Sequence, residues 1–407
     1  MLPACATTLL LLLYPLDAPG EPASPPPPEW QDDEPLPVAS PEPLAVGLFA
    51  TLSAGAYLEG SETSVLPRHR TAEDPARTGL DLQRLQLGFA GARGPLSARA
   101  FLALPHAHGL EVDEVALVLG LPTDGADRAW LRLEGGVLRS RLGHQNALHL
   151  VQQWMPRRPA MTSALLGPRG LVAPGVRAAL EARPGSLHLG IDAELFSVDR
   201  ESDATLAPQT FGGDGPETPT PVLTARARVP VGPLSAEASA TYSFGRMYFP
   251  DRTQLCTIAG VTTPCPAARS HLYGGHVLLE GRPGGMLVRG VLEAFFRRVP
   301  AYDLSSGALY LELDAQPRPW LEAALRVDAV GVPADGTVLR KSQLFSASLA
   351  WTSPSARVRL SYQYDHKPQA LKAPAPPAPP EVDGTALFLQ AEVGLGTLAE
   401  HFTANHR

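Results

Sequence analysis

The sequence lacks three features that would each place it in a familiar class of protein. Beyond the N-terminal region, no apolar run approaches the about 20 residues of a transmembrane helix, which excludes a helical membrane protein. No run of basic residues occurs in a chain whose net charge is −7, so nucleic acid is not an expected partner. Helical periodicity is also scarce, which leaves β-strands as the expected regular structure.

The N-terminal region is first apolar and then rich in proline. An apolar stretch from Ala6 to Tyr14, followed by small residues, is typical of a secretory signal peptide, predicted as residues 1–23. Residues 24–43 hold too little apolar surface to fold, so they are predicted to form a disordered periplasmic leader. Residues 44–407 form the predicted folded domain.

Within this domain, apolar and polar side chains alternate in runs of about ten residues, the period of a strand with two unlike faces. In the segment 321–326, for example, Leu321 and Leu325 lie on one face, whereas Glu322 and Arg326 lie on the other. A soluble β-sandwich has the same period, with its apolar side chains inside. The alternation alone therefore fits both a sandwich and a membrane barrel.

The lengths of the connections separate these two architectures. The predicted strands start near residues 44, 82, 95, 110, 129, 174, 186, 221, 233, 271, 285, 306, 318, 342, 355 and 384. Short links such as Gly94-Pro95 and Gly232-Pro233 follow even-numbered strands, and long links gather at the other end. A sandwich has no physical reason to keep its long loops at one end. We predict an all-β fold, a transmembrane antiparallel β-barrel of about 16 strands (14–18), in a bacterial outer membrane.

The segment 131–183 carries four local features at the middle of this pattern. They are a Gly-rich turn with basic residues (Arg139, Arg141, Gly143), a His/Asn cluster (His144, Asn146, His149), an Arg-Pro pair (Arg158, Pro159) and the stretch Gly167 to Gly170. With these features the segment resembles the corresponding region of porin-like proteins related to phosphate-selective porins, including plugless barrels often labelled TonB-dependent receptors. The resemblance implies a sixteen-stranded pore with a loop folded into the lumen, here residues 143–170.

The inward loop defines the predicted functional residues. Candidates for a pore constriction are Arg139, Arg141, His144, Asn146, His149, Arg157, Arg158 and Arg169. The strand pattern also predicts a set of charged side chains that face the lumen, namely Arg289, Glu293, Arg297, Glu312, Asp314, Glu322, Arg326 and Asp328. Opposite signs interleave in this set, so strong selectivity by net charge is not expected.

The sequence departs from the phosphate-selective pattern in its lysine content. Such pores resemble ladders of lysine, whereas the lysines here are Lys341, Lys367 and Lys372. Selectivity for phosphate is therefore not expected. An active TonB-dependent transporter closes a barrel of about 22 strands with a plug domain, and a Pro-rich tail of this length cannot be one.

We expect a channel for passive diffusion of small solutes, not an enzyme. The alternative is a closed barrel that acts as a surface receptor, scaffold or adhesin without transport. Residues 140–173 distinguish the two hypotheses: a loop that leaves an aqueous path favours the channel, and a loop that fills the lumen favours the alternative. The expected partners are the lipid bilayer, the barrel-assembly machinery, small solutes and further copies of the chain in a homotrimer. No cofactor is expected.

Three groups of residues invite a more specific chemistry. Cys256 and Cys265 lie close together in one polar stretch, and we predict that they form a disulfide in an oxidising compartment. His144 and His149 are five residues apart, with no Cys or carboxylate cluster to complete a ligand set, so no metal site is predicted. Ser186 with His188 has no evident third partner for catalysis.

Overall fold

The computed structural model describes residues 45–59, 79–93, 95–105, 110–122, 129–148, 153–167, 170–198, 210–211, 218–247, 255–258, 261–264, 268–302, 304–332, 342–353, 355–366 and 384–395. The predicted signal peptide, residues 1–23, and the predicted leader, residues 24–43, lie outside these ranges and stay predictions.

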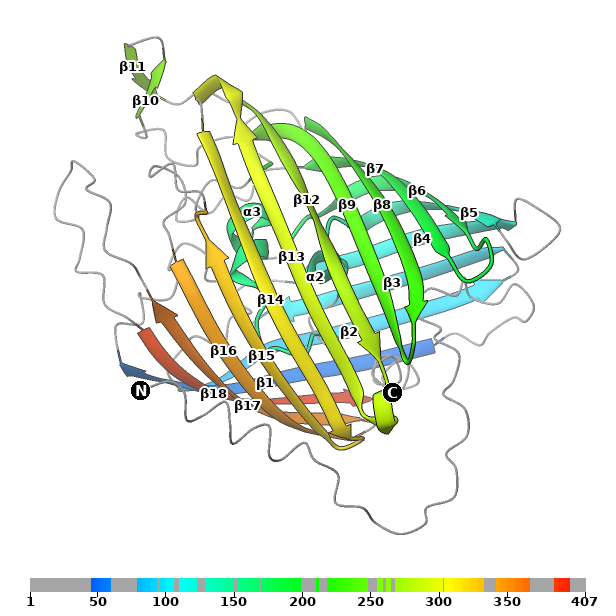
Figure 1. Ribbon diagram of the computed structural model, residues 1–407, viewed down its shortest axis with the longest axis vertical. Coiled ribbons are helices and arrows are strands. Elements are labelled where there is room, and N and C mark those ends of the chain that lie inside the picture. The colour runs from blue at the N-terminus through cyan, green and yellow to red at the C-terminus, as the bar shows by residue number, and fades with distance from the viewer. Residues whose placement is uncertain are drawn as a thin grey trace. The chain divides into compact units, whose positions relative to one another are not determined.

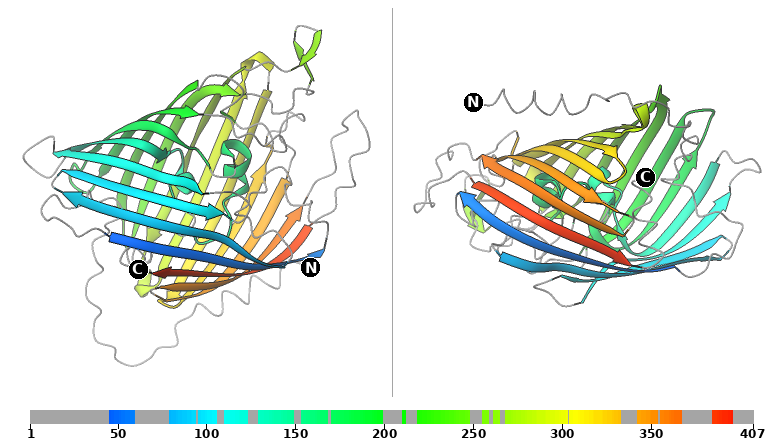
Figure 2. Two further views of the ribbon diagram at one scale, coloured as in Figure 1. Left: turned by 180° about the vertical axis from the view of Figure 1, so that it is seen from behind. Right: turned by 90° about the horizontal axis from the view of Figure 1, so that it is seen from below.

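Sixteen strands close into one antiparallel barrel in which each strand pairs with its neighbours along the chain (Figure 1). They are β1 (Ala45–Glu59), β2 (Gly79–Arg93), β3 (Leu96–Pro105), β4 (Glu111–Pro122), β5 (Ala129–Arg139), β6 (Val172–Ala182), β7 (His188–Val198), β8 (Thr218–Val231), β9 (Leu234–Met247), β12 (Ala268–Gly281), β13 (Leu287–Val299), β14 (Leu304–Arg318), β15 (Leu321–Val330), β16 (Ser342–Thr352), β17 (Ala356–His366) and β18 (Gly384–Leu395). The wall closes where β1 pairs with β18, and Figure 2 shows it from behind and from below.

The predicted fold class is confirmed. Each predicted strand corresponds to one barrel strand. The starts of β2, β8, β12 and β15 differ by three residues from the predicted ones (79 against 82, 218 against 221, 268 against 271, and 321 against 318), and no start differs by more. One hairpin was not predicted: β10 (Leu255–Ile258) pairs with β11 (Val261–Pro264) within the link between β9 and β12.

The inner and outer faces of the wall have the burial of a membrane barrel rather than of a sandwich. On β14, Leu311 and Leu313 are 43% and 52% exposed, whereas the alternate residues Tyr310 and Glu312 are fully buried. A soluble sandwich would bury the leucines. Because apolar side chains cover the outside and polar ones the inside, the outer surface suits a lipid environment, and the closed ladder leaves no unpaired edge in it.

The two ends of the barrel differ in their connections. Tight turns at one end include Gly232, whose φ of 60° places it in the left-handed region that favours glycine. The opposite end carries the link with the β10–β11 hairpin and the segment 140–171 between β5 and β6. One link at this end is shorter than the alternation suggests, because a 3₁₀ turn, η4 (Pro300–Tyr302), joins β13 to β14 almost directly.

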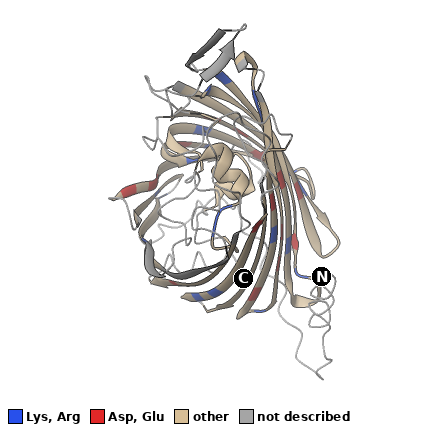
Figure 3. Cartoon of the chain, turned by 90° about the vertical axis from the view of Figure 1, so that its left-hand side faces the viewer, with Lys and Arg blue, Asp and Glu red and all other residues tan. Residues whose placement is uncertain are grey.

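The segment 140–171 holds two short helices, α2 (His144–Ala147) and α3 (Ala160–Leu166). Figure 3 shows them within the ring of strands. Every residue of α3 is buried except Ser163, which is half-buried. Met161, Ala164 and Leu165 are each 1% exposed and belong to one apolar cluster with Val291 and Phe295 of β13. α3, which is mainly apolar and almost fully buried, is therefore a core element. Within the described part of the chain, no helix is long and apolar enough to cross a membrane.

The sequence did not predict α2 and α3, because both helices are short. α2 is a single turn of four residues and α3 has seven, so neither is long enough to display a helical period. α3 begins after Pro159, whose φ of −53° suits the start of a helix.

Of the two cysteines predicted to form a disulfide, the described residues include Cys256. Cys256 lies in β10, where Leu255 pairs with Pro264, the residue before Cys265. Cys265 itself lies outside the described residues, so the disulfide stays a prediction.

Candidate functional site

A continuous chain of ion pairs runs across the inner face of β13, β14 and β15. We call its members the ladder residues: Arg289, Glu312, Asp314, Arg326 and Asp328. The Nε atom of Arg289 lies 2.7 Å from Asp314 Oδ2, and its Nη2 lies 3.0 Å from Glu312 Oε1. Arg326 continues the chain, with Nη1 at 3.3 Å from Glu312 Oε2 and Nε at 3.0 Å from Asp328 Oδ2. Strand register sets these contacts, because Arg289 pairs with Asp314, and Glu312 with Arg326.

The ladder residues comprise three carboxylates and two guanidinium groups, and the inward segment supplies further donors. The backbone N–H of Ala160, at the start of α3, donates to Asp328 Oδ1 at 2.9 Å. The side-chain amide of Gln145, in α2, donates to Glu312 at 3.2 Å. In return, Arg326 donates to the backbone carbonyls of Arg157 and Arg158, at 2.9 and 3.3 Å. The segment is thus bound to this wall at both helices.

Glu293 of β13 provides a second anchor for α2. It accepts hydrogen bonds from the Tyr310 hydroxyl at 2.7 Å and from the backbone N–H of Gln145 at 3.3 Å. Gly143 precedes α2 with a φ of 82°, and a Cβ atom there would lie 1.7 Å from Glu293 Oε1. Only glycine satisfies both the backbone conformation and this close approach.

A third contact joins the segment to β17. Arg357 and Arg359 both donate to the backbone carbonyl of Gln153, each at 2.9 Å. Arg157 donates to the Gln363 side chain at 2.5 Å, beside a cavity with room for about one water molecule. Trp154 is 3% exposed. The segment therefore crosses from β5 to contacts on β13, β14, β15 and β17.

The opposite wall, β2 to β7, carries its own ion pairs. Arg177 lies 2.9 Å from Glu134 and 2.6 Å from Glu194. Arg139 lies 2.7 Å from Asp113. Figure 3 shows basic and acidic residues interleaved along the strands. The inner wall therefore presents both signs of charge at short range.

The predicted constriction residues have distinct surroundings. Arg139 is buried in its pair with Asp113, whereas Arg141 and Arg157 are half-buried. Asn146 ties the two ends of the segment together: it donates to Ser140 O at 2.7 Å and accepts from the N–H of Leu171 at 2.8 Å.

The other candidates are less accessible to a solute or lie outside the description. Arg158 is 8% exposed and donates to the backbone carbonyls of Gln145 and Leu148. Its guanidinium group therefore links two parts of the segment 140–171 to each other. His149 and Arg169 lie outside the described residues.

The predicted lumen-facing residues beyond the ladder are all buried on the inner wall. Arg297 donates to the Ser306 hydroxyl at 3.2 Å, and Glu322 lies 3.5 Å from Arg357. Together with Glu293 and the ladder residues, they form one polar inner surface of β13 to β17.

Sequence reasoning missed His276 of β12, which bridges two residues of β9. Its Nδ1 lies 2.7 Å from Ser239 Oγ and its Nε2 lies 2.9 Å from Glu237 Oε1. The backbone N–H of His276 also donates to Ser239 Oγ, at a point where β9 and β12 skip two ladder pairs. Strand alternation, which places His276 on the inner face with Leu272 and Leu278, was the available signal.

His144 stands next to this cluster, with its ring centroid 5.6 Å from that of His276. Its Nε2 has no hydrogen-bond partner in the described part of the chain. Burial, and then the charges of Arg289, His276 and Arg228, hold the pKa of His144 well below its usual range. The imidazole is therefore neutral at pH 7. No group of three or more His, Cys, Asp or Glu among the described residues is arranged to hold a metal ion.

Comparison with known proteins yields matches in structure but not in sequence. No family model matches the chain, and no curated protein matches it. An anion-selective porin from Comamonas acidovorans is similar at a TM-score of 0.51 and 13% identity, over 87% of this chain and 100% of that one. OmpT of Vibrio cholerae in its trimer form is similar at 0.51 and 10%, over 87% and 100%. OprB of Pseudomonas putida is similar at 0.50 and 9%, over 87% and 94%.

At these identities the likeness concerns the fold. It agrees with the strand order, the apolar outer face and the polar inner face described above. The chain has the fold of bacterial outer-membrane β-barrels, and the predicted location is confirmed at that level.

Proposed function

We propose that the protein is an outer-membrane channel for passive diffusion of small solutes, with residues 140–171 as its constriction. The observation that carries the proposal is the polar inner wall, in which buried arginines and carboxylates alternate across β2 to β7 and β13 to β17. A lumen that never held water would have no need of so many charges, because each one costs free energy to desolvate. A polar interior is typical of barrels with aqueous channels.

The packing of α3 favours the alternative, a closed barrel. Its apolar side chains form a core against β13 and fill that part of the interior. A solute path would therefore run beside the segment, near the half-buried Arg141 and Arg157, rather than through it. This geometry predicts a narrow pore with small conductance.

Single-channel recording in planar bilayers tests the proposal. The full chain and a variant in which a short Gly/Ser linker replaces residues 143–170 are compared. We expect small steps from the full chain and larger steps from the variant. A silent full chain with a conducting variant would assign the segment to a plug, and two silent proteins would favour the receptor or scaffold hypothesis. Heat-modifiable migration in gels verifies that both proteins are folded.

The walls suggest a channel of weak charge selectivity. The Comamonas porin is described as anion-selective, but the inner wall here pairs its arginines with carboxylates, as Arg177 is paired with Glu134 and Glu194. We propose small polar solutes of either charge rather than phosphate.

The proposal includes assembly but no catalysis. One OmpT structure is a trimer form, and we propose a homotrimer for this chain, to be tested by the mass of the detergent-solubilised protein. The Ser239 hydroxyl is bonded twice to His276, once through its ring and once through its backbone N–H. These two bonds stand where β9 and β12 lack ladder pairs. We therefore assign Ser239 a structural role and not that of a nucleophile.

A further inference from the structure

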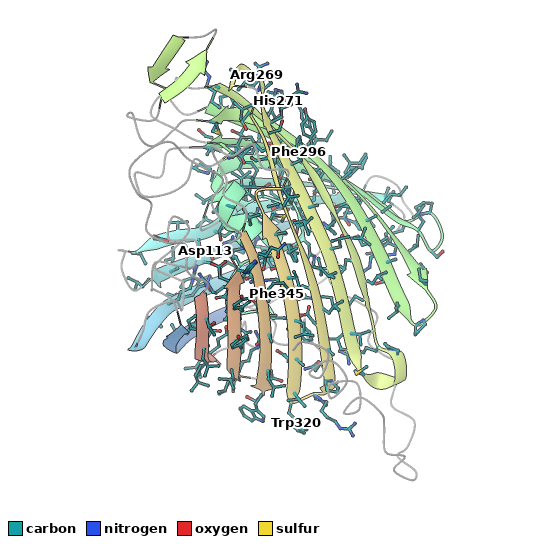
Figure 4. All side chains as sticks on the ribbon, turned by 60° about the vertical axis from the view of Figure 1, so that its left-hand side comes forward. Asp113, Arg269, His271, Phe296, Trp320 and Phe345 are labelled. Atoms are coloured by element: carbon teal, nitrogen blue, oxygen red, sulfur yellow. The ribbon has the colours of Figure 1, made fainter. Side chains whose placement is uncertain are left out.

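The outer face of the barrel carries an unusual group of charges at the long-loop end of β9, β12 and β13. We call Arg246, Arg269 and Arg298 the arginine patch. All three are exposed, and all three alternate with buried, inward-facing neighbours, so they point away from the lumen. In Figure 4, Arg269 lies near the end of the barrel that carries the β10–β11 hairpin, and Trp320 lies at the opposite end.

Strand register brings the patch together. Arg269 pairs directly with Arg246, and His271, two residues further along β12, pairs with Arg298 on one side and with Phe244 on the other. Like charges that face each other across two strands destabilise a sheet unless something compensates them.

Nothing in the described part of the chain supplies that compensation. No carboxylate there forms an ion pair with any of the three arginines. Arg269 instead contacts an aromatic ring: its guanidinium carbon lies 5.8 Å from the centroid of the Phe244 ring. Among the residues that the structure describes, the patch thus presents three positive charges without a carboxylate partner toward the surroundings of the barrel.

The rows beneath the patch fix its height in the membrane. Further from the barrel end than the patch, the next row of outward-facing side chains contains Tyr242, Tyr273 and Phe296. Tyr273 pairs in register with both of the others, and the ring centroids of the two tyrosines lie 5.1 Å apart. Below it the outward residues are small or aliphatic, such as Val277 and Leu292. Aromatic rings gather at the level of the lipid headgroups, so the arginines just beyond them lie at or above that level.

We propose that the arginine patch binds the phosphate groups of an anionic lipid in the outer leaflet, with the acyl chains against the aromatic row. Long loops lie on the external side of such barrels, which assigns the patch to that leaflet. Phosphate is favoured over carboxylate because three neighbouring guanidinium forks offer more charge and more donors than one carboxylate can use. The inference is independent of whether the lumen conducts.

Lipid enrichment on the purified full chain tests this inference. The protein is reconstituted in phosphatidylcholine vesicles that contain phosphatidic acid as the phosphate probe, extracted, and analysed for bound lipid by native mass spectrometry. We expect phosphatidic acid to be enriched on the parent protein. In R246Q/R269Q the enrichment should fall by roughly 25-fold, since each basic residue near a membrane surface contributes about a factor of five to anionic lipid binding and the two factors multiply.

A matched control removes the same number of charges at the other end. Arg93 and Arg318 are exposed arginines at the short-turn end of β2 and β14, and R93Q/R318Q should retain the enrichment. R246K/R269K, which keeps the charge but loses the forks, should bind at an intermediate level.

Three results would overturn the inference. They are equal enrichment in R246Q/R269Q and the parent, equal enrichment of phosphatidic acid and of a fatty acid, which carries a carboxylate and no phosphate, and release of the lipid by inorganic phosphate at millimolar concentration, which would indicate a site for the free ion. Unchanged heat-modifiability and conductance of the variants show that a loss of lipid is not a loss of fold.

Discussion

At the scale of single residues, the close approach of Gly143 to Glu293 gives a sharp test of how the segment docks. In G143A, the added methyl group would collide with the carboxylate and strain the positive φ, which together should destabilise docking by about 1–3 kcal/mol. We expect a larger and noisier conductance. G232A is the control, because Gly232 also has a positive φ but has nothing within 4 Å of its Cβ position. Equal behaviour of both variants would argue against docking at Glu293.

Arg157 and Arg158 are adjacent but differ in their surroundings, so their variants should differ. Arg157 is half-buried beside Gln363, whereas Arg158 holds the carbonyls of Gln145 and Leu148. We expect R157Q to shift the reversal potential toward cations in a salt gradient with little change in stability. R158Q should instead loosen the segment and lower the melting temperature. A parental reversal potential in R157Q would remove this side chain from the constriction.

The same comparison at Arg68 and Arg70, which are predicted to lie in an external loop, stays a useful reference. Arg68 and Arg70 lie outside the described residues, and neutralising them should do little to the reversal potential if the constriction is formed by residues 140–171.

His144 makes docking of α2 dependent on pH. Its pKa is lowered in the docked state, so the docked form binds fewer protons than the undocked form between that lowered pKa and about 6.5. The free energy of docking should therefore fall as the pH drops below about 6.5 and stay constant above it. Trp154 fluorescence between pH 7.5 and about pH 4.5 measures this, with H144Q as the variant that removes the His144 contribution. A slope of the same size in H144Q would assign the effect to other groups.

The site residues differ in how far the sequence could predict them. Arg289, Glu312 and Arg326 follow from strand alternation, because their type and parity place them on the inner face. Their specific pairing requires the register, which alternation does not supply. Gln153 acts through its backbone carbonyl, so its side chain held no signal at all.

At the scale of elements, strands were predictable and the inward segment was not. Each strand has one apolar and one polar face, and the lipid outside makes that pattern strict, so a few residues suffice to recognise it. The helices of residues 140–171 obtain their stability from tertiary packing, as the burial of every residue of α3 except Ser163 indicates. Apolar residues at positions 160–166 are compatible with several structures until the wall around them is known.

The β10–β11 hairpin carries the prediction about the cysteines. The hairpin places Pro264, the residue before Cys265, opposite Leu255, the residue before Cys256. We expect no reaction with a thiol reagent in protein purified without reductant, and two reactive thiols after reduction. Reactive thiols before reduction would contradict the disulfide. C256S/C265S should retain the barrel, since the hairpin is not part of its wall.

At the scale of the whole molecule, closure predicts resistance to detergent. Every strand of the barrel is paired on both sides, so no edge is available from which unfolding can begin. The folded protein should migrate differently in gels before and after boiling, whereas a sandwich of the same composition would show one position. Identical mobility of the two samples would count heavily against the membrane barrel.

The seam between β1 and β18 has a consequence for biogenesis. Residues 48–59 hydrogen-bond to residues 385–395, so the two strands that complete the wall are separated by nearly the whole domain in sequence. A partial chain cannot form this pair of strands, because β18, the partner of β1, is the last barrel strand in the sequence. Secretion and closure are thus ordered in time: the entire chain must cross the inner membrane before the cylinder can be sealed, and until then a chaperone has to shield the open edges.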